Sequence, residues 1–93
     1  MRPIDHLEQY FQQIGCRTYR ASPDHSANQK IYMFGVFADN QLPAETIEYV
    51  IKLYFLESHF HRKFQLPGST MYWFVLTGYG TIPRPAPSRH LFP

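Results

Sequence analysis

Two segments of this chain are apolar on both of the faces that a β-strand presents. Residues 30–38 and 70–77 are rich in aromatic and β-branched side chains, which predicts strands. In the first, Ile31, Met33 and Phe37 alternate with Tyr32, Phe34 and Val36; in the second, Met71, Trp73 and Val75 alternate with Tyr72, Phe74 and Leu76. Strands of this kind belong in sheets that are covered on both sides. A sheet that contains them therefore needs two covers.

Two amphipathic helices are predicted around these strands. Over residues 3–14 apolar side chains recur at the helical period, Pro3 suits the first helical position and Gly15 suits the residue after the end. A second apolar stripe predicts a helix over residues 43–64, which the Pro-Gly pair at 67–68 would then end.

The resulting fold class is α+β. A short strand is predicted over residues 16–21, before a polar loop at 22–29, so the element order is α-β-β-α-β. We expect a three-stranded mixed sheet with both helices on one face, in which the first two strands form an antiparallel hairpin. If the second helix joins parallel strands, its crossover should be right-handed. The second face would be covered by the C-terminal arm, another copy of the chain or a partner.

The length of the chain suits one domain followed by an arm. The 93 residues predict a single domain over 1–81 and an extended, Pro-rich arm over 82–93. The prolines of the arm favour the polyproline II conformation, and its end carries two large apolar side chains. Such an arm could pack on its own domain or reach another molecule.

Composition favours a reducing, aqueous compartment. Cys16 is the only cysteine, so no intramolecular disulfide can form, whereas small secreted domains usually rely on several. The first residues lack the apolar core of a signal peptide, and no run approaches the roughly 20 apolar residues of a membrane span. We therefore expect a cytoplasmic protein without membrane contact.

The chemically reactive residue types do not combine into a recognisable site. Glu57 and His61 would share one face of the predicted helix, and Cys16 would be a nucleophile only with a base in reach. His59 would lie on a different face from His61, so the two imidazoles could not bind one ion. The G-x-G at residues 78–80 lacks the third glycine and the helix of a dinucleotide site. We expect no cofactor and no metal, and the chain favours a binding protein over an enzyme.

An excess of aromatic residues favours binding to another protein. The chain has eight Phe, seven Tyr and one Trp, more than a small core needs, and exposed aromatic rings are enriched at interfaces. We expect a non-catalytic protein-binding module that forms a homo-oligomer or acts as a steric inhibitor of a larger protein or complex, as small proteins of phages and mobile elements do. The predicted partner-binding residues are Tyr32, Phe34, Tyr72, Phe74, Leu91 and Phe92.

Nucleic-acid binding is the alternative function. Residues 1–57 hold seven acidic and five basic side chains, whereas residues 58–93 hold four basic ones and no acid. A basic segment attracts nucleic acid or an acidic protein surface. The predicted nucleic-acid contacts are Arg62, Lys63, Arg84 and Arg89.

Overall fold

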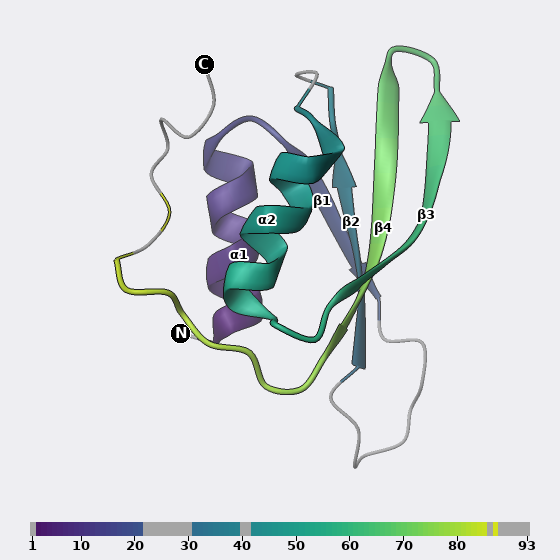
Figure 1. Cartoon of the computed structure of the whole chain (residues 1–93). Coiled ribbons are helices and arrows are strands. Elements are labelled where there is room, and N and C mark those ends of the chain that lie inside the picture. The colour runs from purple at the N-terminus through teal and green to yellow at the C-terminus, as the bar shows by residue number, and fades with distance from the viewer. Residues whose placement is uncertain (1, 22–30, 40–41, 86, 88–93) are drawn as a thin grey trace.

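A computed structural model shows a four-stranded antiparallel sheet with two helices on one side of it (Figure 1). It describes residues 2–21, 31–39, 42–85 and 87. The elements, in chain order, are α1 (Pro3–Gln13), β1 (Arg17–Ala21), β2 (Ile31–Phe37), α2 (Ala44–Tyr54), β3 (His59–Leu66) and β4 (Ser69–Thr77). The predicted α+β class is confirmed, while the prediction of three strands is wrong.

The order of strands across the sheet is β1-β2-β4-β3, and each neighbouring pair is antiparallel. The predicted hairpin of the first two strands is therefore confirmed, and the mixed sheet is wrong because all neighbouring strands are antiparallel. The helix α2 joins β2 to β3, which run parallel to each other with β4 between them. The last strand in the chain, β4, lies in the middle of the sheet. If β4 stood at the start of the chain, the element order would be β-α-β-β-α-β, which is that of the split βαβ arrangement.

The second helix is shorter than its apolar stripe predicted. It ends at Tyr54, where the Phe55 N–H donates to the Ile51 carbonyl at 2.8 Å and Phe55 itself turns to extended backbone. The Tyr54 carbonyl accepts a hydrogen bond from the Thr81 N–H, also at 2.8 Å. Residues 59–66, which the stripe assigned to the helix, form β3 instead. The Thr81 N–H that bonds to the last turn of α2 belongs to the segment after β4. The local sequence around Tyr54 therefore does not predict where the helix ends.

The Pro-Gly pair at 67–68 has a different role from the predicted helix stop. It is the two-residue turn of the β3–β4 hairpin, in which Leu66 pairs with Ser69. Gly68 has a φ of 77°, and Pro67 has its φ fixed near −65° by its ring. These are the residue types and signs of φ of a type II turn.

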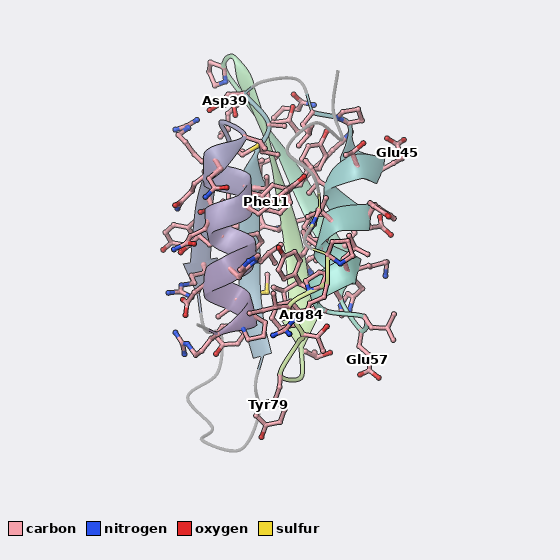
Figure 2. All side chains as sticks on the ribbon, turned by 90° about the vertical axis from the view of Figure 1, so that its left-hand side faces the viewer. Phe11, Asp39, Glu45, Glu57, Tyr79 and Arg84 are labelled. Carbon is pink, nitrogen blue, oxygen red and sulfur yellow. The ribbon has the colours of Figure 1, made fainter. Side chains whose placement is uncertain are left out.

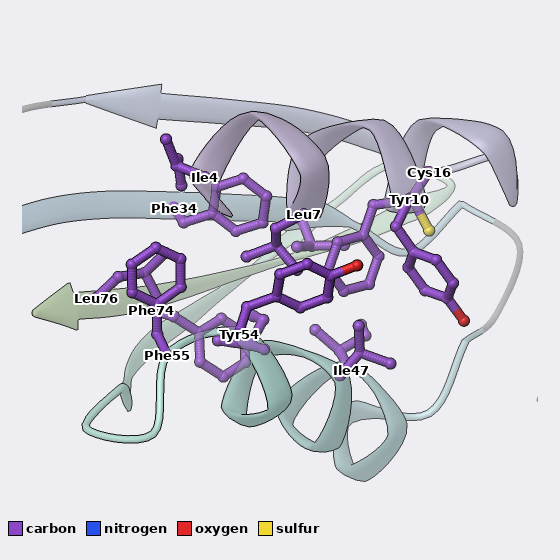
Figure 3. Packing of buried hydrophobic residues seen from close by; sticks show 14 of the residues in the cluster. Ile4, Leu7, Tyr10, Cys16, Phe34, Ile47, Tyr54, Phe55, Phe74 and Leu76 are labelled. Carbon is purple, nitrogen blue, oxygen red and sulfur yellow. The ribbon is translucent and has the colours of Figure 1, made fainter. Parts of the chain in front are cut away.

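The hydrophobic core lies between the helices and one face of the sheet (Figure 3). The rings of Phe11 on α1 and Phe34 on β2 are 6.0 Å apart at the centre of this layer. The helices contribute Ile4, Leu7, Tyr10, Phe11, Ile47, Val50, Ile51 and Tyr54, and the sheet contributes Phe34, Val36, Phe74 and Leu76. The apolar stripe predicted for residues 3–14 is thus the buried side of α1.

The chain after β4 turns towards the helices. Gly80 lies against the Phe55 ring, and Thr81 bonds to the end of α2. Figure 2 places Arg84 on the helix layer, on the side of the molecule opposite the free face of the sheet. The described beginning of the predicted arm therefore lies over the helices.

Candidate binding surface

The burial pattern separates the two faces of the sheet. Phe34 and Phe74, at 0% and 1% exposure, lie under the helices, and a strand turns each neighbouring side chain to the opposite face. Thr18 and Arg20 of β1 hydrogen-bond to residues of α1, so Tyr19 points away from the helices. We call the helix-free side the open face. Its apolar side chains are Tyr19, Met33, Phe37, Phe64, Leu66, Met71, Trp73 and Val75.

The centre of the open face is a flat aromatic surface. A Cβ atom added to Gly35 would lie 2.8 Å from the Met71 Cε and 3.5 Å from the Trp73 ring, so these two side chains lie across the glycine backbone. Trp73 also meets the Tyr19 ring edge to face, with 5.7 Å between centroids and 85° between planes. Because Gly35 has no side chain, the Trp73 ring can lie against its backbone, and the Tyr19 ring contacts the indole from the side. The indole thus packs against both the Gly35 backbone and the Tyr19 ring.

Two guanidinium groups flank this centre. The Arg17 guanidinium carbon lies 4.5 Å above the Phe37 ring, and that of Arg62 lies 5.1 Å from the Phe64 ring. Arg17 also donates two hydrogen bonds to Asp39, at 2.8 and 3.1 Å. The hydrogen bond from Arg17 lowers the pKa of the Asp39 carboxyl below its usual range. Asp39 is therefore a carboxylate at neutral pH and balances the Arg17 charge.

The strand residues on the open face resemble the core of a protein interface in composition. They include aromatic residues, two Met and two Arg, but no Lys, Asp or Glu. Interface cores are enriched in aromatic residues, Met and Arg and depleted in Lys, Glu and Asp. Most of the described acids lie elsewhere, on the helices and the turn after α2; Figure 2 shows Glu45 and Glu57 on that side. The described acids other than Asp39 are therefore separated from the open face by the sheet.

Strand β3 forms one edge of the sheet, and all eight of its residues are exposed. Arg62 pairs with Trp73 and Lys63 with Tyr72, so these neighbouring cations point to opposite faces. His61 is the extra residue of a β-bulge between Phe60 and Arg62. Bulges and charged side chains are devices that protect an edge from further strand pairing. The β3 edge is therefore basic and shielded.

The structure places the predicted partner-binding residues on the helix side of the sheet. Phe34 and Phe74 belong to the core, and Tyr32 and Tyr72 are half-buried against it. Sequence reasoning did not select Tyr19, Trp73 or Phe64, which lie on the open face. The remaining predicted partner contacts, Leu91 and Phe92, lie outside the described residues.

The predicted nucleic-acid contacts do not form one patch in the described chain. Arg62 and Lys63 are exposed on β3, and Arg84 is exposed on the helix layer (Figure 2). Arg89 lies outside the described residues. The basic charge of residues 58–93 is therefore divided between the sheet edge and the opposite side of the molecule.

The predicted pairing of Glu57 and His61 does not form. Because α2 ends at Tyr54, Glu57 lies in the following turn and His61 in the β3 bulge, so the four-residue helical spacing between them is lost. Cys16 is buried beside the end of α1. Among residues 2–21, 31–39, 42–85 and 87, no three His, Cys, Asp or Glu residues are grouped so that they could hold a metal ion.

A solvent-open hollow of about 520 Å³ lies between the start of α2 and the β3–β4 hairpin. Its described walls include Pro43, Gln65, Thr70 and Tyr72. The charged group among these lining residues is Asp39, which Arg17 already engages. The remaining described walls of the hollow are uncharged.

Neither α1 nor α2, the two helices of the described chain, is long and apolar enough to cross a membrane. No protein-family model, curated protein or solved structure matches this chain. The geometry of the open face is thus the basis on which a function can be assigned.

Proposed function

We propose that this chain is a non-catalytic module that binds another protein through the open face of its sheet. The observation that carries the proposal is the exposed aromatic surface around Trp73, with Tyr19 at 56% exposure on one side and Phe64 exposed on the other. Contiguous apolar surface on a small protein marks an interaction site. Binding alone would be sufficient for a steric inhibitor, which acts by occupying a functional surface of a larger protein or complex.

The chemistry of the open face favours a protein partner over nucleic acid. Nucleic-acid interfaces are much more positively charged than protein interfaces, because phosphate contacts supply most of their affinity. The strands place two arginines on this face, and Asp39 neutralises Arg17. The Met71 and Met33 side chains are flexible and polarizable, which suits them to irregular apolar partners. Apolar burial around Trp73 would therefore provide the larger share of the binding energy.

Affinity capture from the native host with two matched variants tests this proposal. Tyr19→Glu introduces a charge beside Trp73 on the open face, and Tyr49→Glu introduces the same charge on α2 at nearly the same exposure, 56% against 54%. Wild type and Tyr49→Glu should retain the same partner protein, whereas Tyr19→Glu should weaken its binding at least about tenfold, as loss of a central aromatic contact does. Both variants are first checked for native melting.

Trp73 provides a second readout of the same experiment. It is the only tryptophan of the chain and lies on the open face, so its emission reports directly on whether that face is covered. Addition of the purified partner should move Trp73 emission to shorter wavelength and reduce its quenching by acrylamide. A partner that leaves Trp73 unchanged, or that both tyrosine variants release equally, would contradict binding at the open face.

Weak nucleic-acid binding is a second candidate, and the basic strand β3 favours it. His59, His61, Arg62 and Lys63 follow one another closely on an exposed strand without any acid, next to aromatic rings on which bases could stack. Binding of a single-stranded oligonucleotide should then fall steeply between about 50 and about 200 mM salt, and replacing Arg62 and Lys63 by Ala should weaken all sequences alike. Absence of binding at the lower salt concentration would eliminate this candidate.

A further inference from the structure

The open face has the properties of a surface that packs against another sheet. Its centre is apolar, with Met71 and Trp73 across Gly35, and its charged groups stand on the flanks. A sheet face exposed to water normally carries polar side chains, whereas sheets that pack face to face meet through apolar side chains across about 10 Å. With its apolar centre, the open face resembles a sheet face that packs against another sheet.

The size of the face suits a specific complex of moderate affinity. Neighbouring strands lie about 4.8 Å apart and rise about 3.3 Å per residue, so four strands of about seven residues outline roughly 19 by 23 Å. Side chains roughen this outline, so two such faces would bury roughly 900–1,400 Å² in total, which reaches the lower end of the range for specific interfaces. An interface of this size is compatible with a specific, reversible dimer.

A two-fold rotation would bring Arg62 of each copy to the Arg17–Asp39 ion pair of the other, so that the Asp39 carboxylate would lie near two guanidinium groups. A rotation about an axis along the strands turns one open face onto another and places the β1 edge of each copy over the β3 edge of the other. The pairing register puts Phe37 and Phe64 at the same level along the strands, and the guanidinium groups of Arg17 and Arg62 stand over these two rings. Arg62 of one copy would thus approach Asp39 of the other, the acid that Arg17 holds.

We propose that two copies of this chain pack open face to open face, with the β1 edge of each over the β3 edge of the other. This proposal rests on the proposed function, which assigns the binding site to the open face. It adds that the molecule bound there is a second copy of the chain. The described chain leaves room for a second copy, because both helices and the segment from Thr81 to Arg84 lie on the other side. Trp73 of each copy becomes buried at the centre of the dimer.

Sedimentation equilibrium of the full chain tests this dimer. From about 1 to about 200 µM protein, the average mass of wild type should rise from 11.0 kDa towards twice that value, and Trp73 emission should shift to shorter wavelength over the same concentrations. Tyr19→Glu should raise the dissociation constant at least about tenfold, whereas Tyr49→Glu should change it less than about twofold. Urea unfolding at low concentration confirms that each variant is folded.

A charge-reversal pair tests the arrangement of the edges. Arg62→Glu and Asp39→Arg should each weaken the dimer, because like charges then meet across the interface. The double variant restores opposite charges and should recover at least about half of the summed loss, on a logarithmic scale of the dissociation constant. If the losses of dimer affinity in the two single variants simply add in the double variant, the placement of the β1 edge over the β3 edge is overturned.

The outcomes separate this inference from the proposed function. A wild-type mass that stays at 11.0 kDa up to about 200 µM overturns the dimer, as does a dimer that Tyr19→Glu and Tyr49→Glu weaken equally. In either case the proposed function stands if a host protein still distinguishes the two variants. If the dimer forms and no host protein binds the open face, the dimer proposal is supported and the proposal that the open face binds another protein is overturned.

Discussion

Tyr54 is the residue through which the two helices meet. Its side chain is almost fully buried, its hydroxyl lies 2.7 Å from Nδ1 of His6, and the two rings are 5.5 Å apart. Burial raises the pKa of Tyr54 to about 12, and the neighbouring Tyr10 phenol acts in the same direction. The folded protein therefore keeps the neutral phenol at pH values at which an unfolded tyrosine would ionise.

This pKa difference predicts a loss of stability in alkali. The folded pKa is raised, so the stabilisation is complete below the unfolded value of 10.0 and is lost as the pH rises towards about 12. Within this window Tyr54 should lower the free energy of unfolding by up to about 1.4 kcal/mol per pH unit. Urea unfolding of wild type and Tyr54→Phe at a series of pH values measures the slope, which should be shallower in the variant.

The matched control is Tyr49→Phe, which removes an exposed hydroxyl from the same helix. Its slope should equal that of wild type. At neutral pH, Tyr54→Phe should lose about 1 kcal/mol because the hydrogen bond to His6 is gone. Equal alkaline slopes in Tyr54→Phe and wild type would show that Tyr54 is not the group responsible.

At the scale of elements, the end of α2 is built from two distant parts of the chain. Gly80 has a φ of 73°, and a Cβ added to it would lie 2.7 Å from the Phe55 ring and 3.0 Å from the Tyr54 carbonyl oxygen. That carbonyl accepts the hydrogen bond from Thr81. Glycine at position 80 therefore allows the segment that follows β4 to approach the end of α2 and cap it.

Gly80→Ala should destabilise the fold more than Gly78→Ala. Both glycines have positive φ, so both variants carry the backbone strain of an alanine in that region, but nothing lies within 4 Å of a Cβ added to Gly78. The clash at Gly80 should cost about 1–3 kcal/mol beyond this shared strain. Chemical unfolding of both variants measures the difference, and equal losses would argue that the contact with Phe55 yields without cost.

Local signals account for the elements that the sequence predicted well. Helix α1 has its proline at the start, its glycine after the end and an apolar stripe between them, and it forms over Pro3–Gln13 as expected within one residue. The stripe of residues 43–64 was misleading because Phe60 and Phe64 fit a helical period as well as the alternation of a strand. Contacts with β4 and with Thr81 decide between the two, and these lie far along the chain.

At the scale of the whole molecule, the existence of an uncovered apolar face was predictable, but its residues were not. A period of two defines two sets of side chains in each strand and does not say which set meets the helices. Phe34 and Phe74 belong to one set, Met33 and Trp73 to the other, and both sets are apolar. The choice depends on how β2 and β4 are oriented against α1 and α2. The predicted binding residues therefore fell on the covered set.

The topology predicts that the chain tolerates a new order of its elements. Arg2 and Pro3 line the same small cavity as residues 78–80, so the start of α1 lies close to the exit from β4. Joining Thr81 to Arg2 through a short Gly/Ser linker and opening the chain between Pro67 and Gly68 gives the order β-α-β-β-α-β. This permutant should fold, since its new ends lie in an exposed turn.

Urea unfolding, circular dichroism and Trp73 emission compare the permutant with wild type. The expected loss of stability is about 1–2 kcal/mol, from the removed hairpin turn. The control opens the chain between Phe34 and Gly35, within a central strand, and should not fold. A permutant that fails to fold even with a longer linker would contradict the proximity of Arg2 to the exit from β4.

The central position of β4 has a consequence for the order of events during synthesis. As the chain leaves the ribosome, β2 emerges with only β1 beside it, and β3 emerges with no strand to join. Both β2 and β3 pair with β4, so the nascent chain carries aromatic strands with unpaired edges until Thr77 has been made. A message cut short before Ser69 would yield a product without β4, whose strands β2 and β3 have no partner between them, and quality-control proteases should remove it quickly.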